Sequence, residues 1–116
     1  EKETNEGFSS TVNLGVKNAE TDLVCLLNSD VILSENCLDP LLHYFDDPQT
    51  AAVGMQDFSD DEATHGRGKF IFHRGFLLHE RFDLGEKELK SGTTGWVSCG
   101  SGLFSKAIWE NFTAFL

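Results

Sequence analysis

The sequence predicts an α/β fold in which a mainly parallel sheet is flanked by helices. The first indication is Leu23–Leu27, a run of apolar residues between polar neighbours, which is typical of a strand buried on both faces of a parallel sheet. The second is that residues 8–19, just before this run, carry apolar residues at helical spacing. The third is another short apolar run, Ala51–Met55, which follows a further helical pattern. Helices that alternate with strands in this way indicate a wound α/β sheet.

Residues 8–19 form the first expected helix. Its apolar side consists of Phe8, Val12, Leu14, Val16 and Ala19. Gly15 lies inside this helix, where a glycine costs about 1 kcal/mol relative to alanine. We therefore expect Gly15 to mark close packing or a kink.

A second helix is expected between the two apolar runs. Ser34 is a suitable N-cap residue, and apolar residues follow at Leu38, Leu41, Leu42 and Phe45. Pro40 has to lie near the first turn, so the regular helix begins later than Ser34 suggests. The strand Ala51–Met55 is then expected to lie beside Leu23–Leu27 and parallel to it.

The pattern does not decide the fold of residues 57–94. Residues 57–68 are polar and glycine-containing, which favours a loop. A calcium loop is the alternative there, although its glycine and glutamate do not stand at EF-hand offsets. Residues 69–73 suit a strand, and residues 76–82 suit either a strand or a short helix.

The last part of the sequence has a clearer pattern. Residues 96–104 are expected to form a buried strand that two glycines interrupt, and glycine in a strand often marks a bulge or the approach of a ligand. Ser105 can cap a final helix over residues 106–112.

The composition is that of an acidic chain with enough apolar bulk for a core. The 116 residues include 19 acidic and 9 basic ones, and the formal net charge is −10. A nucleic-acid surface needs a basic patch, so we expect no nucleic-acid partner. Three cysteines, Cys25, Cys37 and Cys99, show no metal-site spacing. They favour a reducing, cytoplasmic compartment.

The two ends of the sequence resemble the interior of a longer protein. The sequence starts at Glu1 without an initiator methionine and stops at Phe115-Leu116 without a polar tail. We therefore expect residues 1–116 to be the central part of a single larger domain. Sheet edges and apolar surface exposed in such a piece would favour self-association.

Asn28-Ser29-Asp30, at the end of the first apolar run, is the main candidate for chemistry. Ligands collect at the carboxyl ends of strands in α/β sheets. A carboxylate at that position can hold a hard cation that is also bound to phosphate oxygens. The alternative is that Asp30 only stabilises the turn, and the tripeptide by itself leaves both interpretations open.

Further motifs accompany this tripeptide along nearly the whole chain. They are Asn5-x-Gly7-Phe8, Asn13-x-Gly15, Ala19-Glu20-Thr21-Asp22, Leu26-Leu27-Asn28-Ser29-Asp30, Asp47-Pro48, Ala52-Val53-Gly54, Ser98-Cys99-Gly100-Ser101-Gly102-Leu103-Phe104 and Trp109-Glu110. Together these motifs resemble those of family 2 glycosyltransferases, which have the GT-A fold. The resemblance implies the Rossmann-like fold of nucleotide-diphospho-sugar transferases, of which residues 1–116 would be the central part.

The resemblance also implies a set of binding residues. In this family a DxD-type motif binds a divalent cation, Mn²⁺ or Mg²⁺, that holds the diphosphate of a nucleotide-sugar, so Asp30 is the implied metal ligand. Asn28 replaces the first Asp of that motif, and its amide is expected to hydrogen-bond the nucleotide or donor sugar instead. Asn13 is implied to reach the nucleotide. Gly100 and Ser101 are implied to line the donor or acceptor side.

The implied function is metal-dependent, inverting transfer of a hexose from a nucleotide-sugar to a saccharide or lipid-linked acceptor, as in polysaccharide biosynthesis. The expected location is the cytoplasm, and peripheral attachment to the inner face of a membrane stays open. Two alternatives remain. One is a non-catalytic α/β binding or assembly module with the same fold, and the other is a sugar nucleotidyltransferase, although no activation loop of that class is visible.

The catalytic base implied by the resemblance lies beyond Leu116, and the part that binds the nucleoside base precedes Glu1. Three acids inside the chain, Glu62, Glu80 and Asp83, do not match the family's base position. We therefore expect no turnover by the isolated 116-residue chain.

Overall fold

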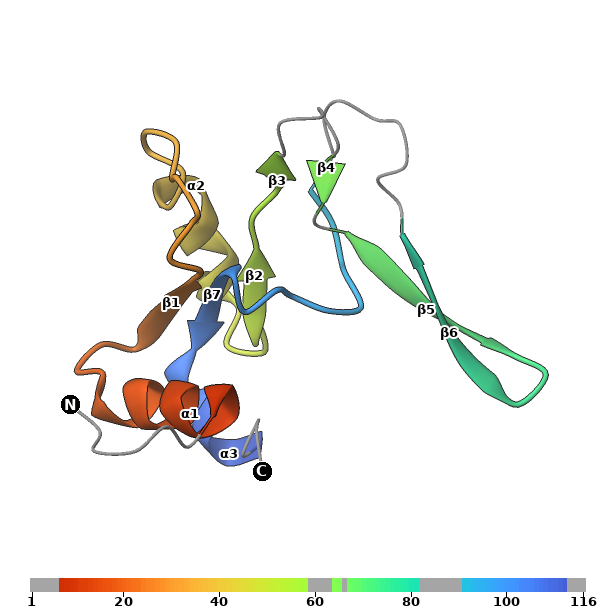
Figure 1. Ribbon diagram of the computed structural model, residues 1–116, viewed down its shortest axis with the longest axis horizontal. Coiled ribbons are helices and arrows are strands. Elements are labelled where there is room, and N and C mark those ends of the chain that lie inside the picture. Colours follow the sequence, from red (N-terminus) through yellow and green to blue (C-terminus); the bar gives the residue numbers. More distant parts are fainter. Residues whose placement is uncertain (1–6, 59–63, 66, 82–90, 113–116) are drawn as a thin grey trace.

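The main body of the molecule is a three-stranded sheet with helices packed against it (Figure 1). The computed structural model describes residues 7–58, 64–65, 67–81 and 91–112. The strand order is β1-β7-β2, where β1 is Leu23–Leu27, β7 is Ser101–Ser105 and β2 is Ala52–Gly54. The central strand β7 pairs antiparallel with both neighbours. The described residues therefore have an α/β architecture, as the sequence predicts.

The prediction that β1 and β2 are adjacent parallel strands is wrong. The two strands point in the same direction, but β7 lies between them and runs the opposite way. An apolar run indicates that a strand is buried but does not indicate which strand lies beside it. Within the described residues β1 is consequently an edge strand, and Leu27 at its end is 41% exposed.

Two of the predicted helices are confirmed. Helix α1 spans Phe8–Asn18, and helix α3 spans Lys106–Phe112 directly after β7. The Ser105 hydroxyl accepts a hydrogen bond from the Ile108 N–H at 3.5 Å, in agreement with the predicted cap. The Lys106 ammonium donates to the Ala19 carbonyl at 2.6 Å and so joins the start of α3 to the C-terminal end of α1.

The second predicted helix is short. Helix α2 spans Asp39–Leu42 and continues as the 3₁₀ helix η1 over His43–Asp46. Pro40 lies in the first turn, where its missing N–H has no helical partner to lose. Ser34 forms only a turn, in which the Cys37 N–H donates to the Ser34 carbonyl. The delayed start that Pro40 predicts is therefore confirmed.

One face of the sheet forms a small core with α1 and α3. Val16 of α1, Phe104 of β7 and Trp109 of α3 are buried together, and the two rings meet edge to face with centroids 5.2 Å apart. Partly buried residues around this cluster are Val12, Val24, Leu26, Ala52, Val97 and Cys99. Neighbours across the strands share a face, so the buried Leu103 lies on the opposite face with Cys25 and Val53.

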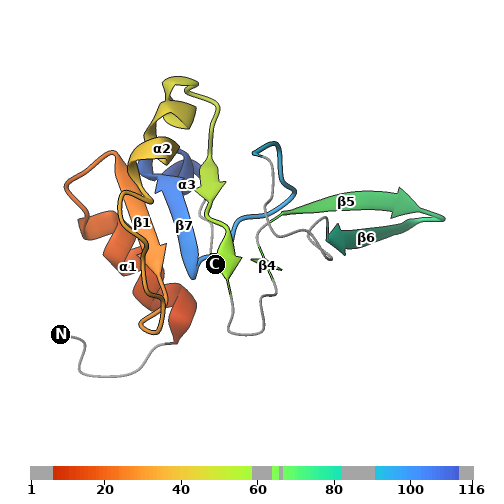
Figure 2. The same ribbon diagram turned by 90° about the horizontal axis from the view of Figure 1, so that it is seen from above.

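In the region that the sequence leaves open, the described residues form four strands in two antiparallel pairs. The short pair is β3 (Asp57–Phe58) with β4 (Thr64–His65), and the long pair is β5 (Gly68–His73) with β6 (Phe76–Arg81). Both views show the long hairpin extending away from the main sheet (Figures 1 and 2). In the described part of the chain, no helix combines the length and the apolar character needed to cross a membrane.

Gly15 does not mark close packing, because a Cβ atom built there has no atom within 4 Å outside its own helix. Replacing Gly15 with Ala should raise the free energy of unfolding by about 0.5–1 kcal/mol, since alanine loses less backbone entropy in a helix. Urea denaturation followed by circular dichroism measures this change. Gly7→Ala is the control and should destabilise, because Gly7 has a φ of 88°. A loss of stability in Gly15→Ala would contradict the open surroundings.

Candidate functional site

Polar residues gather at one end of the central sheet. Because β1 and β2 point in the same direction, their carboxyl ends meet at the same edge, where β7 begins. Asp30 follows β1 in an exposed turn, and Asp57 follows β2 at the start of β3. The sheet topology thus brings two carboxylate-bearing segments to the first residues of β7.

Asn28 and Gly100 lie in direct contact at this edge. The Asn28 N–H donates to the Gly100 carbonyl at 2.9 Å, which extends the β1-β7 ladder by one residue. The Asn28 side chain lies against the α-carbon of Gly100, so that a Cβ built there would be 2.6 Å from Asn28 Nδ2. The Val31 N–H donates to the Asn28 carbonyl at 3.2 Å, which closes the turn that carries Asp30. The sequence-predicted residues Asn28, Asp30 and Gly100 are therefore neighbours.

Ser101 joins this group through Asp57. Ser101 is 2% exposed, and its hydroxyl donates to Asp57 Oδ2 at 2.9 Å. The Ser101 carbonyl accepts from the Met55 N–H at 3.0 Å, which holds the segment after β2 against β7. The sequence places Asp57 in a polar loop, with a calcium loop as the alternative, and does not connect it with Asn28 and Asp30. The available signal was its position three residues after the end of an apolar strand.

Asn13 lies apart from the other predicted site residues. It belongs to α1, and its Oδ1 accepts a hydrogen bond from the indole N–H of Trp109 at 3.0 Å. This contact ties α1 to α3 beside the core cluster. A role of Asn13 in nucleotide binding stays a prediction.

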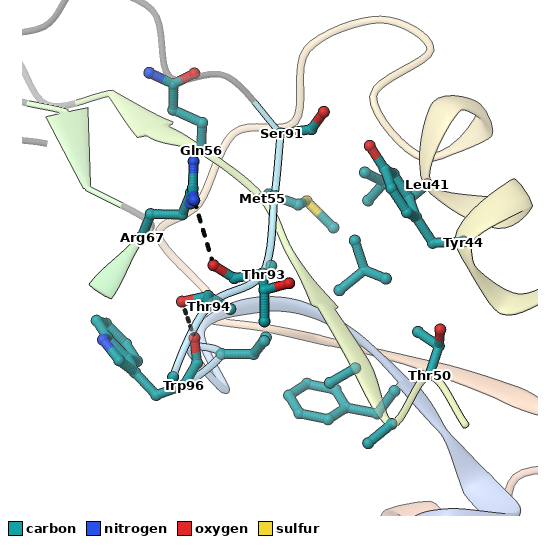
Figure 3. A pocket seen from close by; sticks show the side chains of 18 of the residues that line it. Leu41, Tyr44, Thr50, Met55, Gln56, Arg67, Ser91, Thr93, Thr94 and Trp96 are labelled. Atoms are coloured by element: carbon teal, nitrogen blue, oxygen red, sulfur yellow. Dashed lines mark hydrogen bonds between the residues drawn. The ribbon is translucent and has the colours of Figure 1, made fainter. Parts of the chain in front are cut away.

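A cavity of about 840 Å³ lies along the free edge of β2. Figure 3 shows its walls, with Leu41 and Tyr44 on one side and the segment of residues 91–97 on the other. Arg67 donates to the Thr93 carbonyl at 3.4 Å within this wall. None of the five sequence-predicted site residues lines the cavity, but Gly54, Met55 and Gln56 do, and Met55 bonds to Ser101. The cavity and the polar end of the sheet therefore both lie next to the carboxyl end of β2.

Comparison with known proteins identifies the chain. The family model described as glycosyl transferase family 2 matches residues 1–112. The chain belongs to glycosyltransferase family 2. No curated protein and no solved structure matches it.

Membership in family 2 implies the GT-A fold and agrees with the resemblance drawn from the motifs. It also implies a nucleotide-sugar donor and a glycan acceptor for this glycosyltransferase. In this glycosyltransferase the antiparallel strand β7 lies between β1 and β2, and the polar residues lie at the end of the sheet where β7 begins.

The donor set of the glycosyltransferase suits a cation that arrives with its nucleotide. Among the described residues there is no group of three or more His, Cys, Asp or Glu side chains that could hold a metal ion. Mg²⁺ does not need such a cage, since it is commonly bound by one or two carboxylates together with substrate phosphates and water. Asp30, exposed at the end of β1, fits the role of a single protein carboxylate.

Cys25 and Cys99 of the glycosyltransferase are poorly suited to nucleophilic chemistry. The three cysteines are free thiols. Burial and, to a smaller extent, the neighbouring Cys37 raise the pKa of the Cys25 thiol, and burial raises the pKa of Cys99. Because the thiolate is the reactive form, a raised pKa keeps both side chains unreactive near neutral pH.

Proposed function

We propose that this glycosyltransferase transfers a sugar from a nucleoside-diphosphate donor to a hydroxyl group of a glycan acceptor, with inversion at the anomeric carbon and with a divalent cation. The observation that carries this proposal is the grouping of Asp30, Asn28, Gly100 and the Ser101–Asp57 pair at one end of the sheet. Carboxylates and an amide at the strand ends of an α/β sheet suit a phosphorylated ligand.

Asp30 is the residue proposed to hold the cation. A bound divalent cation supplies the positive charge that stabilises the departing diphosphate. Asp30 lies in an exposed turn, so its carboxylate is accessible to a metal–nucleotide complex from solution. The turn itself is fixed by the backbone bonds of Asn28, which keeps the carboxylate at the end of β1.

Asn28 is proposed to bind the nucleotide or donor sugar through its amide. Both backbone hydrogen bonds of Asn28 anchor it, and its side chain rests on Gly100. An amide offers two donor hydrogens and an acceptor oxygen, which suits hydroxyl and phosphate groups alike. Gly100 has no side chain that could push this amide away.

Asp57 is proposed as the second carboxylate of the site, and Ser101 is proposed to position it. Ser101 is nearly fully buried, and its hydroxyl proton is committed to Asp57 Oδ2. A carboxylate that accepts such a bond is held in one orientation. Asp57 is partly exposed, so it remains available to a hydroxyl group of the ligand.

The reaction is a displacement at the anomeric carbon. The acceptor oxygen forms a bond to this carbon while the bond to the diphosphate oxygen breaks, and the hydroxyl proton passes to a general base. Holding the two substrates in line supplies much of the rate. The cavity beside β2 is the proposed place for the acceptor, because Tyr44, Trp96 and the hydroxyls of Thr93 and Thr94 give it mixed apolar and polar walls.

Asp30→Ala should remove the metal-dependent part of nucleotide binding while the fold stays intact. The loss of affinity should be on the order of 100-fold, since even removal of a residue that only supports a metal ligand costs about 10- to 100-fold. Calorimetric titration of the protein with a nucleoside diphosphate, with and without Mn²⁺, measures this effect.

Asp22→Ala is the matched control, because Asp22 is an exposed aspartate at the opposite end of the same strand. It should leave the affinity unchanged. An Asp30→Ala variant that binds as tightly as the parent would make Asp30 a turn residue only. A parent protein without any nucleotide affinity would favour the non-catalytic module.

A further inference from the structure

The long hairpin β5-β6, residues 68–81, exposes five large apolar side chains. It leaves the main body in both views (Figures 1 and 2). Its exposed apolar side chains are Phe70, Phe72, Phe76, Leu77 and Leu78, which are between 47% and 75% exposed. Two six-residue strands are about 20 Å long, so most of these groups lie well away from the central sheet.

The apolar side chains occupy both faces of the hairpin. Cross-strand partners share a face, and the face alternates along each strand. Phe72 and its partner Leu77 therefore lie on one face, whereas Ile71 with Leu78 lies on the other. His73 and Phe76, the last pair before the turn, also belong to that second face. The end of the hairpin is thus apolar on both sides.

The hairpin is also basic in an acidic protein. The hairpin has a formal charge of +2, from Lys69, Arg74 and Arg81 together with Glu80. Because the whole chain has a net charge of −10, the residues outside the hairpin carry −12. Lys69 and Glu80 form an ion pair at 2.9 Å near the base. The charge that remains exposed at the far end is that of Arg74, beside His73.

Arg74, in the turn at the end of the hairpin, has an unfavourable backbone conformation. Arg74 has a φ of 49° and Gly75 a φ of 86°. Two-residue hairpin turns with positive φ at both positions strongly prefer Asn-Gly or Asp-Gly, since other side chains are strained there. An arginine at this position places a positive charge at the tip where asparagine would fold more easily.

The base of the hairpin is fixed to the body. The Gly95 N–H donates to the Gly68 carbonyl at 2.7 Å, and the Gly68 N–H donates to the Thr94 hydroxyl at 3.2 Å. The His79 ring lies between Phe70 and Trp96, with centroids 5.6 Å from each. The hairpin is therefore presented in a defined direction by contacts at its base.

We propose that this hairpin binds the surface of a membrane that contains anionic lipids. Phe72, Phe76 and Leu77 enter the boundary between headgroups and acyl chains, and Arg74 meets the lipid phosphates. Apolar burial together with attraction to anionic headgroups is the general basis of interfacial binding. Among the described strands β5 and β6 pair only with each other. The backbone groups on their outer edges near the turn therefore need water, so insertion stops at the depth that water still reaches.

A lipid surface explains the arrangement better than a protein partner does. A partner protein that docks on one face of the hairpin would leave the apolar groups of the other face in water. A fluid interface surrounds both faces of the tip at once. The positive tip on a chain of charge −10 also matches a negatively charged surface, because the rest of the chain would be repelled by it.

Cosedimentation of the protein with vesicles tests the proposal. The probe is a vesicle of phosphatidylcholine that contains about one third phosphatidylglycerol, compared with pure phosphatidylcholine. The parent protein should bind the anionic vesicles more tightly, and added salt should weaken binding. Replacing Phe72 and Leu77 together by Ser should reduce the partition coefficient on the order of 10-fold or more. Arg74→Asn, which suits the turn, should reduce binding to anionic vesicles about fivefold and leave binding to neutral ones unchanged.

The double variant Phe8→Ser with Leu14→Ser is the matched control. It removes the same two residue types from exposed positions of α1 and should bind vesicles like the parent. Calorimetric titration with nucleotide and Mn²⁺ should give the same affinity for the hairpin variants as for the parent. Failure of membrane binding is thereby kept separate from failure of the proposed transferase site.

Three outcomes would overturn the proposal. One is a parent protein that does not bind anionic vesicles, and another is equal binding to anionic and neutral vesicles. The third is concentration-dependent self-association that the Phe72→Ser, Leu77→Ser variant abolishes without any vesicle binding, which would assign the hairpin to a second copy of the chain. Should that double variant fail to fold, Arg74→Asn and the salt dependence of the parent still decide the result.

Discussion

Trp109→Ala should lower the free energy of unfolding by about 3–5 kcal/mol, the usual cost of removing a buried tryptophan. Among the described residues Trp109 is one of the few buried apolar side chains, and it contacts Phe104 edge to face. Its indole also donates the hydrogen bond to Asn13 that joins α3 to α1. The core cluster contains Val16 and Phe104 besides Trp109, so few other side chains can replace the lost contacts. Chemical denaturation monitored by circular dichroism measures the change.

Two further variants separate the contributions to that loss. Trp109→Phe keeps an aromatic ring but leaves Asn13 Oδ1 without its donor, so it should cost about 1–3 kcal/mol. Phe112→Ala in the same helix should cost less than about 0.5 kcal/mol, because Phe112 is exposed. A Trp109→Ala protein as stable as the parent would show that α3 does not pack on the sheet in solution.

Gly100→Ala should lower the affinity for the nucleotide-sugar on the order of 100-fold, while stability changes by less than about 1 kcal/mol. The new methyl group would be 2.6 Å from Asn28 Nδ2, so the amide has to move. The amide is on an exposed, polar side chain, which makes the movement inexpensive for folding. Calorimetric titration with the nucleotide-sugar and Mn²⁺, together with a denaturation curve, measures both effects.

Asn28→Ala completes a double-mutant cycle. If the two residues act through the same contact, Gly100→Ala in an Asn28→Ala background should cause little additional loss. Gly15→Ala is the control and should leave the affinity unchanged, since a Cβ at that helix glycine meets no atom within 4 Å outside its own helix. Fully additive losses for Gly100 and Asn28 would mean that Gly100 makes room for the ligand itself.

The sequence predicts the local elements of this fold better than their arrangement. Helical spacing located α1, the Ser105 cap located α3, and Pro40 explained the late start of α2. Strand order failed because β7 and β1 are paired by residues about eighty positions apart, such as Leu23 with Ser105. Hydrophobic patterns report burial along the chain and carry no information on such distant pairing.

The candidate site shows the same division. Motif resemblance assembled Asn28, Asp30, Gly100 and Ser101, which the structure brings to one end of the sheet. Asp57 was missed because its partner Ser101 lies 44 positions away. The hairpin was left undecided because its two faces are both apolar, so its strands lack the regular alternation that marks a half-buried strand.

The central position of β7 has a consequence for how this chain folds. Both neighbours of β7 are synthesised first, and neither pairs with the other in the described sheet. Neither strand can form its hydrogen bonds in this sheet until β7 is present, because Leu23 of β1 pairs with Ser105 and Gly54 of β2 pairs with Gly102. Loop closure over such separations slows folding, and a growing chain on the ribosome carries β1 and β2 as unpaired apolar strands until β7 emerges. During synthesis these strands are therefore the segments most in need of protection from aggregation.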